Sequence, residues 1–327
     1  MLFMKKLLVV LVLAVFIATA IATIGVEFFG TQDDTTPPEP IPFWSMNQYK
    51  ANTHTHTNRS LDSWTSPQDR VYQYQDRGYD ILAITDHYLG FDTFESIGVT
   101  DYYLTPISSN EAEGVIAHIN VYYTYIEFAI MAPTSIFDLT TEGGGICILN
   151  HPGKYDNVTM EQRIEWYRNY PCIVGMEIVN RNDRYEEDRE IWDACLTALM
   201  PERNIFCVAT DDTHDDDDIG WSYTMFIAPD RSEESIEYAF RNGHYYAVTN
   251  ALVENPVGEE PRITNVTQAE DGTITVEGTN YDKVTWISCG EIVGYGNTFN
   301  PSECQKYVRF ELEGQGGTAF SQPLPLY

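Results

Sequence analysis

Basic residues are scarce in this sequence of 327 residues: Lys and Arg number 19 against 49 Asp and Glu, which gives a formal net charge of −30. Because nucleic-acid affinity depends on Lys and Arg that neutralise phosphates, this balance disfavours a nucleic-acid polymer as a partner. The six cysteines show no C-x-x-C spacing, which argues against a zinc finger. Apolar residues are plentiful, at 43% hydrophobic and 13% aromatic, so the chain can form a core and is not disordered overall.

One long uncharged run stands near the start of the chain. Residues 7–26 carry no charge, follow Lys5 and Lys6, and are about long enough to cross a bilayer as a helix. Small residues at Ala18 and Ala20 offer an A-x-A-like cleavage site. Residues 1–26 are therefore predicted to be either a cleaved signal peptide or an uncleaved membrane anchor. Both readings predict an extracytoplasmic protein, secreted or anchored in the membrane.

The chain after this run changes texture twice. Residues 27–42 are rich in proline and acidic residues, which is typical of an extended linker. From residue 43 to residue 253, short apolar runs alternate with helical patterns, which predicts a buried parallel sheet and an α/β fold. The expected strands cover 79–85, 145–150, 174–179, 205–209 and 244–248, and the expected helices cover 68–78, 161–168, 187–200 and 233–242.

Helical patterning is absent after residue 254, where Gly, Asn and Asp turns separate strand-like runs at 274–277, 283–288 and 306–313. Residues 254–327 are therefore predicted to form a small all-β domain, close to the minimum size for independent stability. An exported protein can form disulfides. Cys289 and Cys304 flank a short β-type segment and are the best candidate pair.

Six of the seven histidines fall in short polar clusters at or just after predicted strand ends. Residues i and i+2 of a strand point the same way, so His54-x-His56 and Asp212-x-His214 each direct two ligands to one point. In an α/β barrel the carboxyl ends of the strands meet at one mouth. Imidazole together with carboxylate suits zinc, manganese or iron, so the set predicts a metal centre. The six histidines are His54, His56, His87, His118, His151 and His214.

The order of these motifs resembles that of the PHP (polymerase and histidinol phosphatase) superfamily. The motifs occur in the order His-x-His after a strand, Asp-His after the next helix and strand, a Glu, Asn-His-Pro-Gly, and finally Asp-x-His. The resemblance spans residues 50–248. The resemblance implies a distorted barrel of seven β/α units, a cluster of two or three metal ions, and the hydrolysis of phosphoesters.

The resemblance also implies a role for each motif residue. It makes Glu111 the carboxylate that bridges two ions, with Glu113 as a competitor for that position. The family usually has Asp or His where this chain has Leu61, and the nearest candidate is Asp62, one residue later. First-ion ligands would be His54, His56 and Asp212, second-ion ligands would be His118 and His151, and third-ion ligands or phosphate contacts would be His87 and His214, together with Asp62. The implied catalytic set is His54, His56, Glu111, His151, Asp212 and His214.

Two bridged ions would supply a hydroxide at neutral pH, because each lowers the pKa of bound water, and they would neutralise the charge of a phosphate. The predicted function is thus an exported metal-dependent phosphoesterase that acts on a small-molecule phosphoester. Basic residues near the motifs would help to bind the phosphate, or they are ordinary surface charges: Arg59, Lys154, Arg181 and Arg184. Two alternatives stay open, a hydrolase of a non-phosphate bond with the same fold and a surface-tethered binding module with a metal-stabilised barrel.

Overall fold

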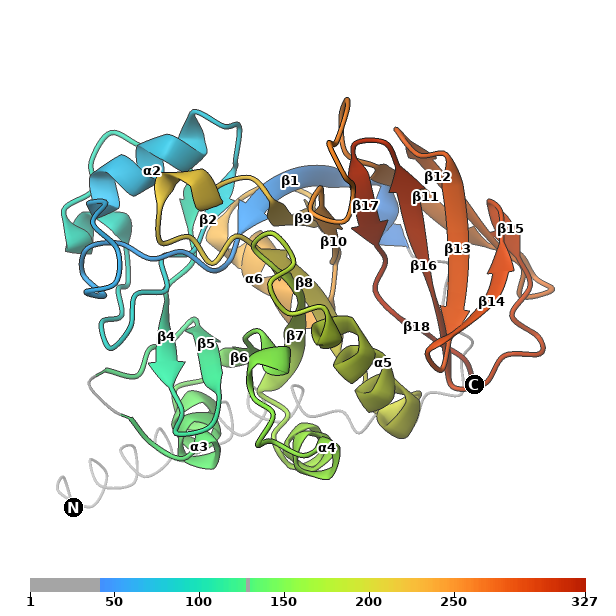
Figure 1. Cartoon of the computed structure of the whole chain (residues 1–327), viewed down its shortest axis with the longest axis horizontal. Helices are drawn as coiled ribbons and strands as arrows, with labels where there is room; N and C mark the ends of the chain where they lie inside the picture. The colour runs from blue at the N-terminus through green and yellow to red at the C-terminus, as the bar shows by residue number, and fades with distance from the viewer. Residues whose placement is uncertain (1–41, 128–129) are drawn as a thin grey trace, which may run out of the picture. The chain divides into compact units, whose positions relative to one another are not determined.

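The strands from Asn47 to Thr249 belong to two mixed sheets in the computed structural model, which describes residues 42–127 and 130–327 (Figure 1). In the first sheet β1 pairs parallel with β2, β2 parallel with β3, and β9 antiparallel with both β1 and β10. In the second, β4–β5 and β5–β6 are antiparallel, and β6–β7 and β7–β8 are parallel. The first sheet contains β1 (Asn47–Asn52), β2 (Ile81–Leu82), β3 (Thr105–Pro106), β9 (Ser222–Ala228) and β10 (Tyr245–Thr249), and the second contains β4 (Ser109–Glu113), β5 (His118–Tyr122), β6 (Ile146–Leu149), β7 (Ile173–Asn180) and β8 (Phe206–Thr210).

The two sheets meet through isolated bridges between Thr55 and Thr213 and between His87 and Glu111. Within the described ranges the strands do not pair into one closed ladder, so the α/β prediction is confirmed while the seven-unit barrel is not seen as a closed ring. The physical reason lies after β8. Asp212 has φ of 43°, so the backbone leaves the extended conformation just before Thr213. The contact with the segment after β1 is therefore a single bridge, in which the backbone N–H of His56 donates to the Thr213 oxygen at 2.9 Å.

The α-helices of the described chain follow the strands and cover the sheets (Figure 1). The helix α3 packs against β5 and β6, α4 and α5 pack against β7, and α6 packs against β9. Local signals set the ends of these helices. Ser66 and Ser232 accept the N–H three residues on and so cap α2 and α6, and Gly243 ends α6 with φ of 70°. The bounds are α2 (Pro67–Gln75), α3 (Pro133–Glu142), α4 (Met160–Asn169), α5 (Glu187–Leu199) and α6 (Glu233–Asn242), with short 3₁₀ turns at η1 (Pro42–Ser45), η2 (Phe94–Ile97), η3 (Pro152–Lys154) and η4 (Asp216–Asp218).

The largest buried cluster lies between the second sheet and its helices. Met176 on β7 is fully buried there together with Phe137 of α3 and Trp192 of α5, and Trp166 of α4 is 6% exposed. Burying one such side chain contributes about 1.5–3 kcal/mol. The core therefore fixes the strands whose ends carry the predicted ligands.

Every element that the structure describes after β10 is a strand. The strand β17 pairs antiparallel with β10, so the first sheet continues into the C-terminal region, while β11, β12 and β15 form a separate three-stranded sheet (Figure 1). The domain boundary after residue 253 stays a prediction. These strands are β11 (Arg262–Gln268), β12 (Ile274–Thr279), β13 (Lys283–Ser288), β14 (Glu291–Tyr295), β15 (Thr298–Phe299), β16 (Tyr307–Gly314), β17 (Gly317–Phe320) and β18 (Leu324–Pro325).

Two predictions on cysteines and membranes have different outcomes. All six cysteines are free thiols, so the expected pair of Cys289 and Cys304 is not formed. Cys289 lies in the turn after β13 with φ of 50°, and its sulphur contacts the backbone oxygen of Gln305 at 3.7 Å. Residues 1–26, and the linker 27–42 except its last residue, lie outside the described residues. Among those that are described, no helix is both long and apolar enough to span a bilayer.

Candidate metal centre

The structure brings all nine predicted ligands together at one pocket of about 330 Å³. They come from positions in or beside six strands that are distant in sequence. His54 and His56 are fully buried, while the histidine rings farther from β1 border the pocket. His54 and His56 follow β1, Asp62 lies between β1 and α2, His87 follows β2, Glu111 lies in β4, His118 begins β5, His151 follows β6, and Asp212 and His214 follow β8.

Four side-chain atoms, one each from His54, His56, Asp212 and Glu111, form a cage at the base of the pocket. His54 Nε2 lies 3.1 Å from His56 Nε2, and these two nitrogens lie 3.2 and 3.3 Å from Asp212 Oδ1. Glu111 Oε2 lies 3.4 and 3.3 Å from the same nitrogens. Neighbouring ligand atoms of a tetrahedral zinc ion with ligands at about 2.0–2.1 Å lie ~3.3–3.4 Å apart, and the three atoms of His54, His56 and Asp212 have distances close to this.

Neighbouring residues set the tautomers of His54 and His56, and these tautomers are the ones that bind a cation through Nε2. His54 Nδ1 is bonded to Glu177 Oε1 at 2.7 Å, and His56 Nδ1 to Ser60 Oγ at 3.1 Å. When both Nδ1 atoms act as donors, two Nε2 lone pairs face each other across 3.1 Å beside two carboxylate oxygens. Four electron-pair donors around one point repel each other unless a cation lies between them. The donor set of imidazole and carboxylate therefore suits a transition metal.

Glu111 extends from this cage to a second group of ligands. Its Oε1 lies 3.0 Å from His118 Nδ1 and 3.6 Å from His151 Nε2, and it accepts a hydrogen bond from Asn150 Nδ2 at 2.7 Å. The two oxygens of this carboxylate thus face different sets of imidazoles. Glu111 therefore contacts both groups, and its role as a bridging ligand stays a prediction.

Asp62 gathers a third group of ligands. Its Oδ2 lies 3.2 Å from His87 Nε2 and 3.0 Å from His214 Nε2. Leu61, at the position where the PHP motif usually has Asp or His, is 88% exposed. Glu113, the competitor of Glu111, comes only within 3.7 Å of His87 Nδ1 and accepts a hydrogen bond from the Tyr88 hydroxyl. Asp62 therefore lies close enough to His87 and His214 to share an ion with them, its role in place of the missing motif residue stays a prediction, and Glu113 lies at the edge of the centre.

Burial and opposite charges act against each other on the carboxylates of the centre. Burial alone would raise the pKa of Glu111, but the imidazoles of His118 and His54 hold that pKa well below its usual range. Burial likewise opposes ionisation of Asp212, and His54 holds the pKa of Asp212 well below its usual range. The carboxylates are thus ionised and need positive charge beside them. A divalent ion held by these residues would supply this charge in place of protonated imidazoles, because a histidine nitrogen must lose its proton to bind a metal.

Three of the four basic residues named from the sequence line the pocket: Lys154, Arg181 and Arg184. Arg184 Nη2 lies 3.3 Å from Asp212 Oδ2, and Arg181 Nη1 lies 3.1 Å from Asp218 Oδ1. Arg59 instead faces Asp86 at 3.5 Å and donates to the backbone oxygen of Gly90. Positive charge therefore borders the pocket on the side of the loops after β6 and β7.

Sequence reasoning missed Glu177, a fully buried carboxylate behind His54. It lies in the middle of β7, within the apolar run 174–179 that was interpreted only as a strand. An acidic residue inside a run that is otherwise apolar is costly to bury without partners. That single feature could have identified Glu177 from the sequence.

Asp188, in the first turn of α5, connects that helix to the loop of His151. Its Oδ1 accepts the Gly153 N–H at 2.6 Å, and its Oδ2 has no hydrogen-bond partner among the described residues. Burial raises the pKa of Asp188 to about 8, against ~3.9 in an unfolded chain. The folded protein thus holds a proton that the unfolded chain releases. This group therefore makes the free energy of unfolding fall as the pH rises from about 4 to about 8, by up to ~1.4 kcal/mol per pH unit.

The variant Asp188→Asn keeps an oxygen that accepts the Gly153 N–H but cannot titrate. We expect this variant to gain stability relative to the unchanged protein between pH 5 and pH 8, because only the unchanged protein loses a favourable proton there. Urea unfolding at both pH values measures the two differences in free energy. A difference between variant and unchanged protein that stays constant with pH would contradict this prediction.

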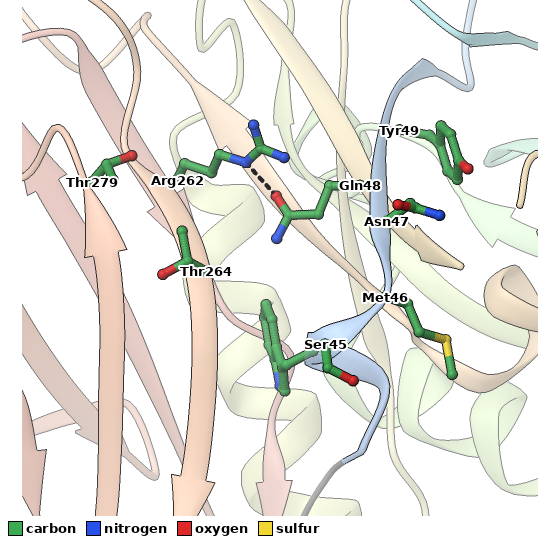
Figure 2. Close-up of a pocket in the computed structure, with 9 residues that line it drawn as sticks. Ser45, Met46, Asn47, Gln48, Tyr49, Arg262, Thr264 and Thr279 are labelled. Atoms are coloured by element: carbon green, nitrogen blue, oxygen red, sulfur yellow. Dashed lines mark hydrogen bonds between the residues drawn. The ribbon is translucent and has the colours of Figure 1, made fainter. Parts of the chain in front are cut away.

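A larger hollow, of about 740 Å³, lies beside η1 and β1 (Figure 2). Figure 2 shows Arg262 donating to Gln48, with Nε and Oε1 2.6 Å apart. Arg262 is the one charged residue among those that line it, and no histidine or carboxylate lines it. Among the described residues, the groups of His, Asp and Glu that lie close enough to share an ion are all at the smaller pocket, so we place the candidate site there.

Comparison with solved structures gives fold matches at low sequence identity. The chain is similar to a two-domain protein from Bacteroides vulgatus that contains a predicted PHP-like metal-dependent phosphoesterase, at 17% identity over 90% of this chain and 100% of that chain, with a TM-score of 0.50. It also matches PsfC from Pseudomonas syringae at 14% identity over 59% of this chain and 88% of that chain, with a TM-score of 0.43. The lesion-specific endonuclease PfuEndoQ from Pyrococcus furiosus matches at 11% identity over 69% of this chain and 64% of that chain, with a TM-score of 0.44.

No family model matches the sequence, and no curated protein matches it. The first of the three structural matches spans both the α/β part and the C-terminal strands of this chain, because it covers 90% of the chain. The chain therefore has a PHP-like fold, as the order of its histidine and carboxylate motifs predicted.

Proposed function

We propose that this chain, which has a PHP-like fold, is a metal-dependent phosphoesterase that acts on small-molecule phosphoesters. The observation that carries the proposal is the group of His54, His56 and Asp212, whose ligand atoms lie 3.1–3.3 Å apart as around one metal ion, with Glu111 Oε2 within 3.4 Å of both histidines. The residues of the cage, of the second group and of the third group would hold two or three ions of zinc, manganese or iron.

Each part of the pocket has a distinct task in this proposal. The bound ions would supply an activated water and neutralise the phosphate. Lys154 and Arg184 border the same pocket as the ligands, and their charges would bind and orient an anionic substrate. This positive edge matters because the whole chain has a net charge of −30, which repels anions. A pocket of about 330 Å³ suits a small ester better than a polymer.

Export is part of the proposal. The uncharged run of residues 7–26 behind Lys5 and Lys6 supports a signal peptide or a membrane anchor, and either would place the catalytic part outside the cytoplasm. Cell fractionation with an antibody against the C-terminal strands, together with N-terminal sequencing, distinguishes cleavage from anchoring. Recovery of the uncut chain in the cytosol would contradict export.

The purified protein is expected to release inorganic phosphate from small phosphomonoesters such as p-nitrophenyl phosphate. Prolonged chelation should abolish the activity, because the ligand residues alone cannot activate water. Adding back zinc, manganese or iron(II) separately should restore it with the ion that the site uses. Phosphate release and metal content per chain are measured on the same samples.

A panel of amide, lactone and glycoside substrates run beside the phosphoesters serves as the control on the bond that is cleaved. Turnover of one of these in place of every phosphoester would assign the fold to another hydrolysis. Full metal loading with no turnover of any substrate would favour a binding module instead.

A further inference from the structure

Glu177 lies directly behind the cage and engages both of its oxygens. Its Oε1 is bonded to His54 Nδ1 at 2.7 Å and accepts the Thr210 hydroxyl at 2.6 Å. Its Oε2 accepts the His151 N–H at 2.8 Å and Asn180 Nδ2 at 3.0 Å. The side chain is fully buried and does not line the pocket. Four hydrogen bonds account for the lone pairs of a carboxylate, so Glu177 has no capacity left to bind an ion itself.

We propose that Glu177 is a positioning residue, which sets the tautomer of His54 and ties His54 to His151. A backbone N–H and an amide NH₂ can only donate, so Glu177 acts towards them as an acceptor. His54 must then donate from Nδ1, and its Nε2 lone pair points to the atoms of the cage. A carboxylate behind a ligating histidine holds the ring in place and increases its basicity.

The bond to His151 gives Glu177 a second task. His151 has φ of 30° and ψ of 61°, in the left-handed region that costs free energy for a residue with a side chain. Its N–H is held by Glu177 Oε2, which helps to keep this backbone in place. The His54 ring belongs to the cage, whereas the His151 ring faces the other oxygen of Glu111. One buried carboxylate therefore supports ligands of two ion positions at once.

The variant Glu177→Gln keeps the size of the side chain but replaces one acceptor oxygen with an NH₂ donor, so it tests the hydrogen bonds of Glu177 without leaving a cavity. If its amide NH₂ faces His54, that ring must accept at Nδ1 and carry its proton on Nε2, where an ion would bind. If the NH₂ faces the other way, it meets the His151 N–H and Asn180 Nδ2, and donors face donors. In one orientation the variant no longer sets the His54 tautomer, and in the other it no longer accepts the hydrogen bonds of the His151 N–H and Asn180. We expect the variant to bind zinc ~10–100-fold more weakly, with fewer ions per chain at a fixed zinc concentration.

The experiment titrates zinc into the full chain by calorimetry and records the imidazole nitrogens of the zinc-loaded protein by NMR. In the unchanged protein, His54 should carry its proton on Nδ1, and this signal should be lost or moved in Glu177→Gln. Asp188→Asn is the matched control, because it also replaces a buried carboxylate near the His151 loop with an amide but does not touch His54. It should leave zinc affinity unchanged.

Unchanged zinc affinity and an unchanged Nδ1 signal in Glu177→Gln would overturn the proposal, and so would an equal loss in Asp188→Asn. Should Glu177→Gln fail to fold by circular dichroism, Thr210→Val removes only one of the four hydrogen bonds and should weaken zinc binding by ~2–10-fold. Unchanged affinity in Thr210→Val would then overturn it. The inference rests on the proposed function only for the presence of metal. Zinc affinity that responds to Glu177 without any phosphoester turnover would reject the function and keep the positioning role.

Discussion

Replacing Glu111 with Gln is expected to lower kcat/KM for a phosphomonoester by at least ~10³-fold, which corresponds to ~4 kcal/mol of transition-state stabilisation. Glu111 is 1% exposed, and its two oxygens reach His54, His56 and His87 on one side and His118 and His151 on the other. The amide of Gln carries no charge and can offer only one acceptor oxygen. It cannot link the two groups of ligands, so both metal content and turnover should fall.

The matched control is Glu113→Gln, two residues along the same strand. Glu113 is the other carboxylate that the motif spacing allowed, yet it comes only within 3.7 Å of one histidine nitrogen. This variant should retain its metal and lose ~tenfold or less in kcat/KM. Initial rates and metal analysis on both variants, at the same pH, measure the contrast. Equal losses in the two variants would contradict the bridging position of Glu111.

The residues that meet at the candidate site were predictable in part, because short polar motifs follow strand ends. His54 and His56 lie two residues apart just after β1, whereas Asp212, two residues beyond β8, has φ of 43°, so extended backbone does not account for the Asp212-x-His214 pair. Helix ends were equally clear, since the predicted 233–242 helix is observed as Glu233–Asn242 between a serine cap and a glycine. Local patterns therefore identified the residues that converge.

A polar strand at the site, β4, was not predicted from the sequence. The strand β4, with the sequence SNEAE, has four buried residues, yet it contains only one apolar residue. Glu111 faces the centre, Asn110 bonds the backbone of Ile126, and Ala112 alone packs in the hydrophobic core, so no apolar run marks β4 as a strand. After β1, the side chains of Thr85 and Asp86 likewise accept hydrogen bonds from the backbone N–H groups of Thr55 and Thr57. Such partners lie about thirty residues apart in sequence and cannot be paired by local pattern.

Removing the carboxylate of Asp193 is expected to have the largest effect on stability. Asp193 of α5 accepts hydrogen bonds from Arg309 Nε and Nη2 at 2.9 and 2.6 Å and from the Tyr307 hydroxyl at 2.8 Å. Arg309 is 3% exposed, and its guanidinium also lies over the Trp192 ring. Asp193→Ala leaves this buried cation with Glu311 as its remaining partner. We expect a loss of ~3–5 kcal/mol in the free energy of unfolding.

This contact joins helix α5 to strand β16, so the variant also tests whether the C-terminal strands unfold together with the α/β part. Lys283→Ala is the control, because it breaks an ion pair with Glu313 at 2.8 Å whose partners are 47% and 38% exposed, and it should cost ~1 kcal/mol or less. The double variant Asp193→Ala/Arg309→Met should recover part of the loss, since no buried charge is left unpaired.

Urea unfolding with a chelator present removes any contribution of bound metal. One shifted transition would show that β16 and α5 belong to the same cooperative unit, whereas an early transition confined to the C-terminal strands would show that residues 254–327 unfold by themselves. A loss no larger than that of Lys283→Ala would contradict the expected cost of the unpaired charge.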